Sequence, residues 1–289
     1  MPRLQLLDWC DGGNMKVVPL TGLMGAEVFG ADMKNPDHFD QIKTAFVQHS
    51  VVILREQNIT PDDHLHFARR WGDINVNRFF TALGSHPEIA IVLKEANQTG
   101  AIGEEWHTDH AYDQIPALGS ILHAIETPPF GGDTAFCSMA AAYDALSDRF
   151  KDMLRGLQAW HSSRHVFGDN QADSNAAASG RIGNADLAVQ DALHPVVIAH
   201  PLSGRKGLFV NPQFTTQIDG LEKAESDAIL NMIYTHCQKP EFQCRVRWQD
   251  GDVTMWDNRA TWHKAINDYH GHRRYMHRVT VEGVPLVAG

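Results

Sequence analysis

The first third of the chain alternates between helical and extended patterns of apolar residues. Within residues 36–50, apolar side chains recur at intervals of three and four, which is the spacing of one helical face. Residues 51–56, VVILRE, form a β-branched apolar run of strand length. Thr60 then precedes Pro61, a pair typical of a helix N-cap followed by proline at the first helical position. The pattern predicts a helix, a strand and a second helix.

From about residue 89 the pattern changes to many short apolar runs separated by Gly, Pro, Asn and Asp. These runs are IAIVL, GSILHAIE, HPVVIAH, GLFVN, CRVRW and VTMW. Their length and spacing predict short strands in a sandwich or barrel. Residues 138–157 and 221–237 predict helical inserts. We therefore expect one mainly β domain over residues 1–289, with flanking helices packed on its outside.

Residues 162–186 show no apolar period and are rich in Ser, Asn, Asp, Ala and Gly. A structureless stretch of this length inside a compact domain is usually a functional loop or a disordered one. We expect it to form a lid.

Composition and charge narrow the classes of function. The chain has 35 acidic and 25 basic residues, a net charge of −10, which argues against a general nucleic-acid or anionic-membrane binder. No apolar run is long enough for a membrane span or a signal-peptide core, so we expect a cytoplasmic protein. The four scattered cysteines form no CxxC pair and indicate neither a disulfide framework nor a zinc–thiolate site. An anionic ligand would have to meet locally placed arginines.

The stretch EEWHTDHAYD, residues 104–113, holds candidate metal ligands. In an extended segment His107 and Asp109 point to the same side, while Thr108 faces away. Imidazole and carboxylate suit Fe(II), and a second histidine would complete a facial triad with open coordination positions. Two ligands alone do not make a site, and the chain contains 17 histidines. The stretch by itself is consistent with a metal site or with a polar patch.

The C-terminal block, residues 253–283, adds further motifs that, together with earlier ones, make the metal-site hypothesis specific. The informative motifs are WHTD, PPFGGDTAF, HPVVIAHPLSGRKGLFVN, CRVRW, and WDNRATWHKAINDY followed by RRYMHR. Through these motifs, in order over nearly its whole length, the chain resembles the taurine dioxygenase and 2,4-dichlorophenoxyacetate dioxygenase family of Fe(II)- and 2-oxoglutarate-dependent oxygenases. The likeness is strongest to the aryloxyalkanoate (dichlorprop-type) dioxygenases. The resemblance implies a double-stranded β-helix, which is a cupin-like jelly roll.

The resemblance also implies which residues bind the metal and the cosubstrates. His107, Asp109 and His263 would hold Fe(II), and 2-oxoglutarate and O₂ would be the cosubstrates. These three residues would be the catalytic centre.

Three further residues are implied to bind 2-oxoglutarate. Arg278 would pair with its distal carboxylate, and Thr134 would hydrogen-bond the same group. An arginine fork matches a carboxylate in a bidentate way, and a short hydroxyl can complete its solvation. Arg274 would lie near the 1-carboxylate. If this segment is a strand, both arginines face the same side, as a shared site requires.

The substrate pocket is harder to predict than the cosubstrate site. The candidates for substrate contact are Asn77, Arg78, Phe80, Gly103, His110 and Phe209. Arg78 could pair with an anionic head group or be an ordinary surface arginine. His110 directly follows the carboxylate ligand and could contact substrate.

The leading hypothesis is hydroxylation of a small organic anion, either an aryloxyalkanoate-like carboxylate or an alkyl sulfonate. C–O or C–S cleavage could follow, with release of succinate and CO₂. A second hypothesis keeps the iron and the cosubstrate but ends in desaturation, epimerisation or cyclisation of a natural-product or amino-acid-derived substrate. A remote third is a non-enzymatic metal-binding β-sandwich, which would need a closed, four-ligand site. The resemblance also implies a homo-oligomer.

Overall fold

The computed structural model describes residues 15–168 and 180–289, and a nine-stranded sheet is its largest element. Its strands are β1 (Lys16–Pro19), β2 (Ala26–Phe29), β3 (Val51–Leu54), β4 (Ile74–Asn75), β5 (Ala82–Leu83), β6 (His86–Lys94), β7 (Gly119–Glu126), β15 (Val253–Asp257) and β17 (Arg274–Val281). Their order is β1-β2-β3-β15-β7-β17-β6-β5, and β4 pairs with β17 off this path. Neighbouring strands run antiparallel except β2 and β3.

A second antiparallel sheet packs against the large one. It contains β14 (Gln243–Val246), β8 (Thr134–Ser138) and β16 (Thr261–Ala265), in that order. Side chains of both sheets share a buried apolar cluster that includes Leu122, Phe136, Cys244, Val246, Trp256 and Met276. The arrangement confirms the expected jelly roll, in which two antiparallel sheets bury their inner faces together.

Two small sheets extend the molecule beyond the jelly roll. One contains β10 (Asp191–Pro195), β9 (Gln158–Ser162) and β13 (Thr215–Ile218), and the other β12 (Lys206–Leu208), β11 (Val197–Ala199) and β18 (Val287–Ala288). Most of the apolar runs after residue 89 lie in these strands or in the two larger sheets, as the pattern predicted.

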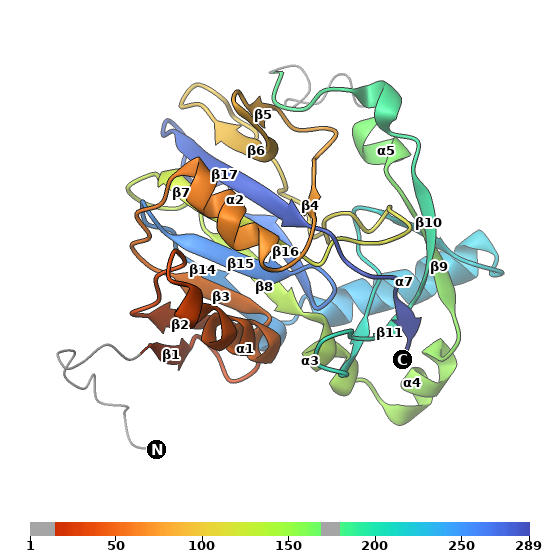
Figure 1. The fold of residues 1–289 in the computed structure, drawn as a ribbon. Coiled ribbons are helices and arrows are strands. Elements are labelled where there is room, and N and C mark those ends of the chain that lie inside the picture. The colour runs from red at the N-terminus through yellow and green to blue at the C-terminus, as the bar shows by residue number, and fades with distance from the viewer. Residues whose placement is uncertain (1–14, 169–179) are drawn as a thin grey trace.

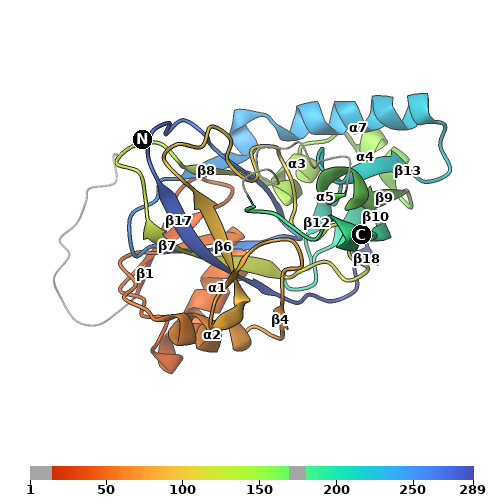
Figure 2. The same cartoon turned by 90° about the horizontal axis from the view of Figure 1, so that it is seen from above.

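Helices cover the strands on opposite sides of the molecule (Figure 1, Figure 2). They are η1 (Pro36–His38), α1 (Phe39–His49), α2 (Pro61–Arg69), α3 (Met139–Asp144), α4 (Asp148–Leu154), α5 (Arg164–Phe167), η3 (Ala185–Leu187), α7 (Lys223–Cys237) and η4 (Pro240–Phe242). In both views α1 and α2 lie on one side and α7 on the other. The apolar side chains of α1 and α2 join a buried cluster with those of β7, β15 and β17.

The predicted start of α2 is confirmed. The Thr60 side chain accepts from the Asp63 backbone N–H, and the Asp63 carboxylate accepts from the Thr60 backbone N–H, which completes a capping box. The predicted single helix over residues 138–157 is wrong, because α3 ends at Asp144 and α4 begins at Asp148. The Ser147 side chain accepts from the Phe150 backbone N–H, so it caps a new helix instead of continuing the first.

The expected lid is described only at its two ends. Residues 162–168 include α5, and residues 180–186 lead into η3, whereas residues 169–179 lie outside the described part of the chain. Both described ends contribute residues to the cavity described below. The lid itself stays a prediction, because the middle of the segment lies outside the described residues.

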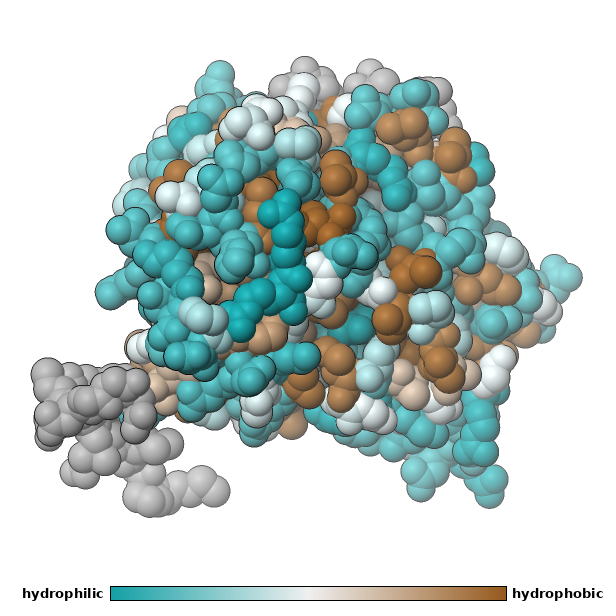
Figure 3. All heavy atoms as spheres, in the orientation of Figure 1, coloured by the Kyte–Doolittle hydropathy of each residue, from teal (hydrophilic) through white to brown (hydrophobic). Residues whose placement is uncertain are grey.

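The face shown in Figure 3 is mainly hydrophilic, with scattered apolar side chains. Of the described helices, none has both the length and the apolar character that crossing a bilayer requires.

Candidate metal centre and its cavity

Backbone hydrogen bonds hold two histidines side by side. The His107 N–H donates to the His263 carbonyl at 3.1 Å, and the His263 N–H donates to the His107 carbonyl at 2.8 Å. His263 lies in β16, and the Thr108 hydroxyl donates to the Thr261 carbonyl of the same strand at 3.0 Å. Thr108 therefore faces away from its neighbours, as predicted, and the two imidazole centroids lie 4.1 Å apart.

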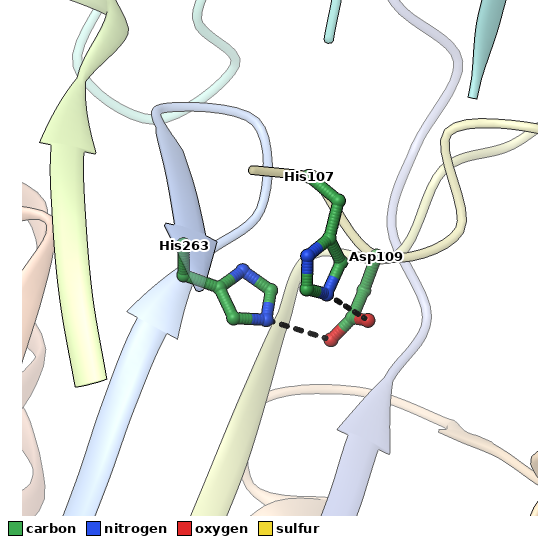
Figure 4. Close-up of side chains that lie close together, drawn as sticks. All are labelled: His107, Asp109 and His263. Atoms are coloured by element: carbon green, nitrogen blue, oxygen red, sulfur yellow. Dashed lines mark ion pairs between the residues drawn. The ribbon is translucent and has the colours of Figure 1, made fainter. Parts of the chain in front are cut away.

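Asp109 completes a group of three possible metal ligands (Figure 4). Its Oδ1 lies 3.6 Å from Nε2 of His107, and its Oδ2 lies 3.7 Å from Nε2 of His263. The ligand atoms all lie within 4.8 Å of one another, and no other such group was found within residues 15–168 and 180–289. Ser120 Oγ donates to Asp109 Oδ2 at 3.1 Å and fixes the carboxylate. The backbone bridge between His107 and His263 and the hydrogen bond from Ser120 to Asp109 thus bring the predicted triad together.

The protonation states of these side chains fit a divalent cation. Nδ1 of His107 lies 2.7 Å from the Glu105 carbonyl, to which it can only donate, so Nε2 keeps its lone pair for a metal. Burial, and then the neighbouring His107, hold the pKa of His263 well below its usual range. Burial would raise the pKa of Asp109, but Arg278 and then His263 hold it well below its usual range. Neutral imidazoles and an ionised carboxylate are the forms that bind Fe(II).

The triad lies in a cavity of about 460 Å³. Its described apolar walls come from distant parts of the chain and include Phe80, Val92, Leu122, Val166, Phe167, Ile182, Phe214 and Trp256. The polar lining residues are the triad, Thr134, Gln213, His165, Glu104, Glu105 and two arginines. A largely apolar cavity with a few convergent polar groups is typical of a site for a small molecule.

Arg278 lies at the metal end of the cavity. Its Nη1 is 3.2 Å from Asp109 Oδ2, and its guanidinium lies over the Phe80 ring, 4.4 Å from the centroid. Arg274 and Thr134 instead share Trp248: the guanidinium of Arg274 lies 5.6 Å from that ring, whose Nε1 donates to Thr134 Oγ1 at 3.0 Å.

The sequence prediction grouped Arg278 with Thr134 and placed Arg274 apart from them. In the structure Arg274 is grouped with Thr134, and Arg278 lies beside Asp109. The reason is the register of β17 against β7. Arg278 lies opposite Leu122, and Ser120, two residues earlier in β7, holds the Asp109 carboxylate. The loop that carries Asp109 is therefore tied to the sheet near Arg278 rather than near Arg274.

Of the six candidate substrate contacts, Phe80 and Gly103 line the cavity. Gly103 has a φ of +79°, and a Cβ there would lie 3.1 Å from Cε1 of His107. Its carbonyl accepts from the Ala265 N–H at 2.7 Å, which fixes it beside β16.

The other four candidates are not among the described lining residues of the cavity; they are Asn77, Arg78, His110 and Phe209. The Asn77 side chain accepts from the backbone N–H groups of Phe79 and Phe80. Arg78 pairs with Asp113 at 2.7 Å, and Nδ1 of His110 lies 2.8 Å from the same carboxylate. Phe209 packs against His161 and His194. These residues shape the segments that carry the lining and are not themselves among the described lining residues.

Sequence reasoning missed the cavity residues at both ends of the expected lid and in the segment after Phe209. Val166 and Phe167 of α5, Ile182, and Gln213 with Phe214 line the cavity. Apolar residues within a stretch otherwise rich in Ser, Asn and Gly were the available signal for the first three.

A family model described as "Taurine catabolism dioxygenase TauD, TfdA family" matches residues 16–280. The chain is 32% identical over 288 residues to an alpha-ketoglutarate-dependent sulfate ester dioxygenase of Pseudomonas putida, covering 94% of this chain and 91% of that protein. It is also 32% identical over 287 residues to an alpha-ketoglutarate-dependent 2,4-dichlorophenoxyacetate dioxygenase of Cupriavidus pinatubonensis, covering 91% and 96%.

A solved structure with a similar fold is a taurine dioxygenase from Burkholderia xenovorans. It has a TM-score of 0.80 and 30% sequence identity, over 95% of this chain and 91% of that one.

Proposed function

Because the chain belongs to the TauD/TfdA family of dioxygenases, we propose that it is an Fe(II)- and 2-oxoglutarate-dependent oxygenase that hydroxylates a small organic anion. The observation that carries this proposal is a three-ligand triad that shares one cavity with two buried arginines. Relatives named as sulfate ester and 2,4-dichlorophenoxyacetate dioxygenases support an anionic substrate, either an aryloxyalkanoate-like carboxylate or an alkyl sulfonate or sulfate.

His107, Asp109 and His263 would hold the iron. When bound there, Fe(II) supplies O₂ activation coupled to the oxidation of 2-oxoglutarate to succinate and CO₂. The backbone bridge keeps both imidazoles in place, and the Glu105 carbonyl fixes the tautomer of His107. Three protein ligands leave positions open for the cosubstrate, unlike a closed structural site.

Geometry supports exchanging the roles of the two arginines. The distal carboxylate of 2-oxoglutarate lies at the end of the molecule away from the chelating groups. Arg274 and Thr134, grouped around Trp248 away from the Asp109 carboxylate, suit that end. Arg278, beside Asp109, suits an anionic group close to the metal, either the 1-carboxylate or the substrate's own anion.

The apolar walls would hold the body of the substrate and exclude water. Phe80, Phe167 and Phe214 supply flat apolar surface at the metal end of the cavity, where Phe80 lies beside Arg278 and Phe214 beside His107. Exclusion of water strengthens the electrostatic contacts inside the cavity and protects the substrate from side reactions.

The test is anaerobic reconstitution of the full chain with Fe(II), followed by 2-oxoglutarate and then a panel of phenoxyalkanoates, alkyl sulfonates, sulfate esters and amino-acid-derived acids. We expect a visible charge-transfer band with 2-oxoglutarate, and succinate formation that depends on one class of substrate. His263→Ala should lose both. If the wild-type protein shows neither the band nor succinate formation, the proposal is wrong. Product mass separates hydroxylation, which adds one oxygen, from desaturation, which removes two hydrogens.

We also propose that the protein is cytoplasmic. The family resemblance supports a homo-oligomer, and the composition of residues 162–186 supports a lid over the cavity. Light scattering on the purified protein measures the subunit number.

A further inference from the structure

Lys94, at the end of β6, is a buried cation without a hydrogen-bond partner among the described residues. Its relative exposure is 2%, and its Nζ lies over the Tyr269 ring, 4.2 Å from the centroid. An ammonium group withdrawn from water is strongly unfavourable unless a counter-charge or a hydrogen-bond acceptor meets it. The ring face satisfies this need only in part. Among the described residues no acceptor lies within hydrogen-bonding distance of the Lys94 ammonium, so an anion bound beside it would be stabilised.

The register of β6 against β17 places Lys94 on the cavity side. Lys94 lies directly opposite Arg274, and residues opposite one another in an antiparallel pair project from the same face. Arg274 lines the cavity, and so does Val92, two residues before Lys94 on the same face. Lys94 thus lies beside Arg274 on the same face of the sheet, next to the described lining of the cavity and not part of it.

Tyr269 and Gly132 connect this lysine to the other residues of that end. A Cβ at Gly132, which has a φ of +68°, would lie 3.3 Å from Cδ1 of Tyr269 and 3.4 Å from Cδ of Arg274. Gly132 lies two residues before Thr134 in the GGDT motif. Tyr269 therefore lies beside both Lys94 and Arg274, and Thr134 is joined to Arg274 through Trp248.

The region contains charges of both signs, because Glu104 acts on Lys94 and Arg181, and Asp133 acts on Arg274. Nη1 of Arg181 donates to the carbonyls of Leu93 and Gly100, which places a further guanidinium beside Lys94. Burial, and then Arg181, lower the pKa of Lys94, while Glu104 opposes them. The Glu104 carboxylate accepts from the Ala101 N–H and the Asn267 side chain, and its side chain is exposed.

We propose that Lys94 supplies a second positive charge to the subsite for the distal carboxylate of 2-oxoglutarate, beside Arg274 and Thr134. This inference rests on the proposed function and extends it. Two cations at this end would select 2-oxo acids that carry a second carboxylate over those with a neutral tail, because only the former gains from the additional charge.

The test compares the binding of two ligands by calorimetry under anaerobic conditions, with the full chain loaded with Mn(II). The ligands are 2-oxoglutarate and 2-oxobutyrate, which has the same chelating end and no distal carboxylate. We expect Lys94→Met to weaken binding of 2-oxoglutarate about 10- to 100-fold, the range for a lost hydrogen bond or ion pair to a charged group. Its affinity for 2-oxobutyrate should stay within about threefold, and Lys94→Arg, which keeps the positive charge, should recover part of the lost affinity for 2-oxoglutarate.

Lys151→Met is the matched control, because Lys151 also lies over a tyrosine ring, at 5.5 Å from Tyr143, but in α4. It should bind both acids like the wild type. If Lys94→Met does not fold, Lys94→Gln replaces it in the same comparison. Unchanged affinity for 2-oxoglutarate, or an equal loss for both acids, would overturn the role of Lys94. A wild-type protein that does not bind 2-oxoglutarate would instead contradict the proposed function, and the inference would fail with it.

Discussion

At the scale of single residues, the position of the His107 imidazole depends on the absence of a side chain at Gly103. Gly103 leaves the space beside this imidazole free, since a Cβ there would approach Cε1 of His107 to 3.1 Å and its Nε2 to 3.7 Å. Gly103→Ala should therefore push the imidazole away from its position. We expect the metal affinity to fall at least about tenfold, because a ligand displaced by a fraction of an ångström loses coordination geometry. Titration with Mn(II) measures this.

Gly220→Ala is the control for Gly103→Ala. Gly220 has a similar φ of +75°, but a Cβ at this position would have no atom within 4 Å among the described residues. Both substitutions carry the left-handed backbone penalty of about 1–2 kcal/mol. Only Gly103→Ala should weaken metal binding. An equal loss of metal affinity in both variants would show that backbone strain, and not crowding of His107, is the cause, and no loss in either variant would contradict the prediction.

Trp248 holds the Thr134 hydroxyl through a single hydrogen bond of 3.0 Å. Trp248→Phe removes the N–H and keeps an aromatic ring beneath Arg274. The loss of one hydrogen bond, worth about 1 kcal/mol, should raise the KM for 2-oxoglutarate about fivefold and leave kcat nearly unchanged. Trp160→Phe, which removes the bond from an exposed indole to Asp219, should not change this KM. A parallel fall in kcat would contradict the assignment of Trp248 to cosubstrate positioning.

The metal ligands could be predicted from sequence, but the order of the arginines could not. His107 and Asp109 are two residues apart, and the C-terminal motifs supply His263. Arg274 and Arg278 lie on the same face of one strand, so the spacing alone cannot say which is nearer the metal. That depends on where the loop carrying Asp109 meets the sheet, which is a tertiary contact through Ser120.

At the scale of elements, the outer face of the large sheet carries a cluster of histidines beneath α2. His277 of β17 lies opposite His123 of β7, whose ring centroid is 6.1 Å from that of His64 in α2. Burial, and then His123, lower the pKa of His64 to about 3, while burial, and then His277, lower the pKa of His123 to about 4. Nε2 of His277 lies 2.8 Å from the Tyr275 hydroxyl. The sheet and α2 are therefore packed around neutral imidazoles.

This cluster predicts a loss of stability in mild acid. The folded-state pKa values lie below the unfolded value of about 6.5, so the unfolded chain binds more protons below that pH. The free energy of unfolding should be fully present above pH 6.5 and fall as the pH falls toward 4. Urea unfolding at pH 7 and pH 5 measures the difference. His123→Gln should reduce this difference by about 1 kcal/mol.

His270→Gln, at an exposed position, is the control for His123→Gln. If both variants show the wild-type dependence on pH, the outer histidines do not cause the acid loss.

Element boundaries were predictable where local side chains decide them. The capping box of α2 depends on Thr60 and Asp63 alone, and both can be read from the sequence. The break between α3 and α4 depends on Ser147, which is compatible with a helix interior or with an N-cap. In the structure Ser147 takes the second role, with its hydroxyl accepting from the Phe150 N–H.

At the scale of the whole molecule, we expect the core to be stable without the metal. Four buried apolar clusters hold the sheets and helices together, and the His107–His263 bridge is made of backbone hydrogen bonds. Removal of the metal with a chelator should leave the circular dichroism spectrum unchanged. The melting temperature should fall by less than about 10 °C, because only the free energy of metal binding is lost. Unfolding on chelation, as in zinc fingers, would contradict a preformed site.

The jelly roll and its helical cover could be predicted from the alternation of apolar runs and from the motif resemblance. The walls of the cavity could not, because they combine short segments near residues 80, 92, 166, 182 and 214. Each segment is ordinary on its own, and only the closed fold brings them together.

Trp256 also gives the protein an optical reporter. Its ring centroid lies 4.8 Å from that of His263, and the side chain lines the cavity. A paramagnetic ion held by His263 would quench the fluorescence of this indole at short range, whereas Trp160 is exposed near the far sheet of β9. The emission of the unlabelled protein therefore offers a direct way to follow metal loading, and Trp256→Phe identifies the part of the signal that belongs to the site.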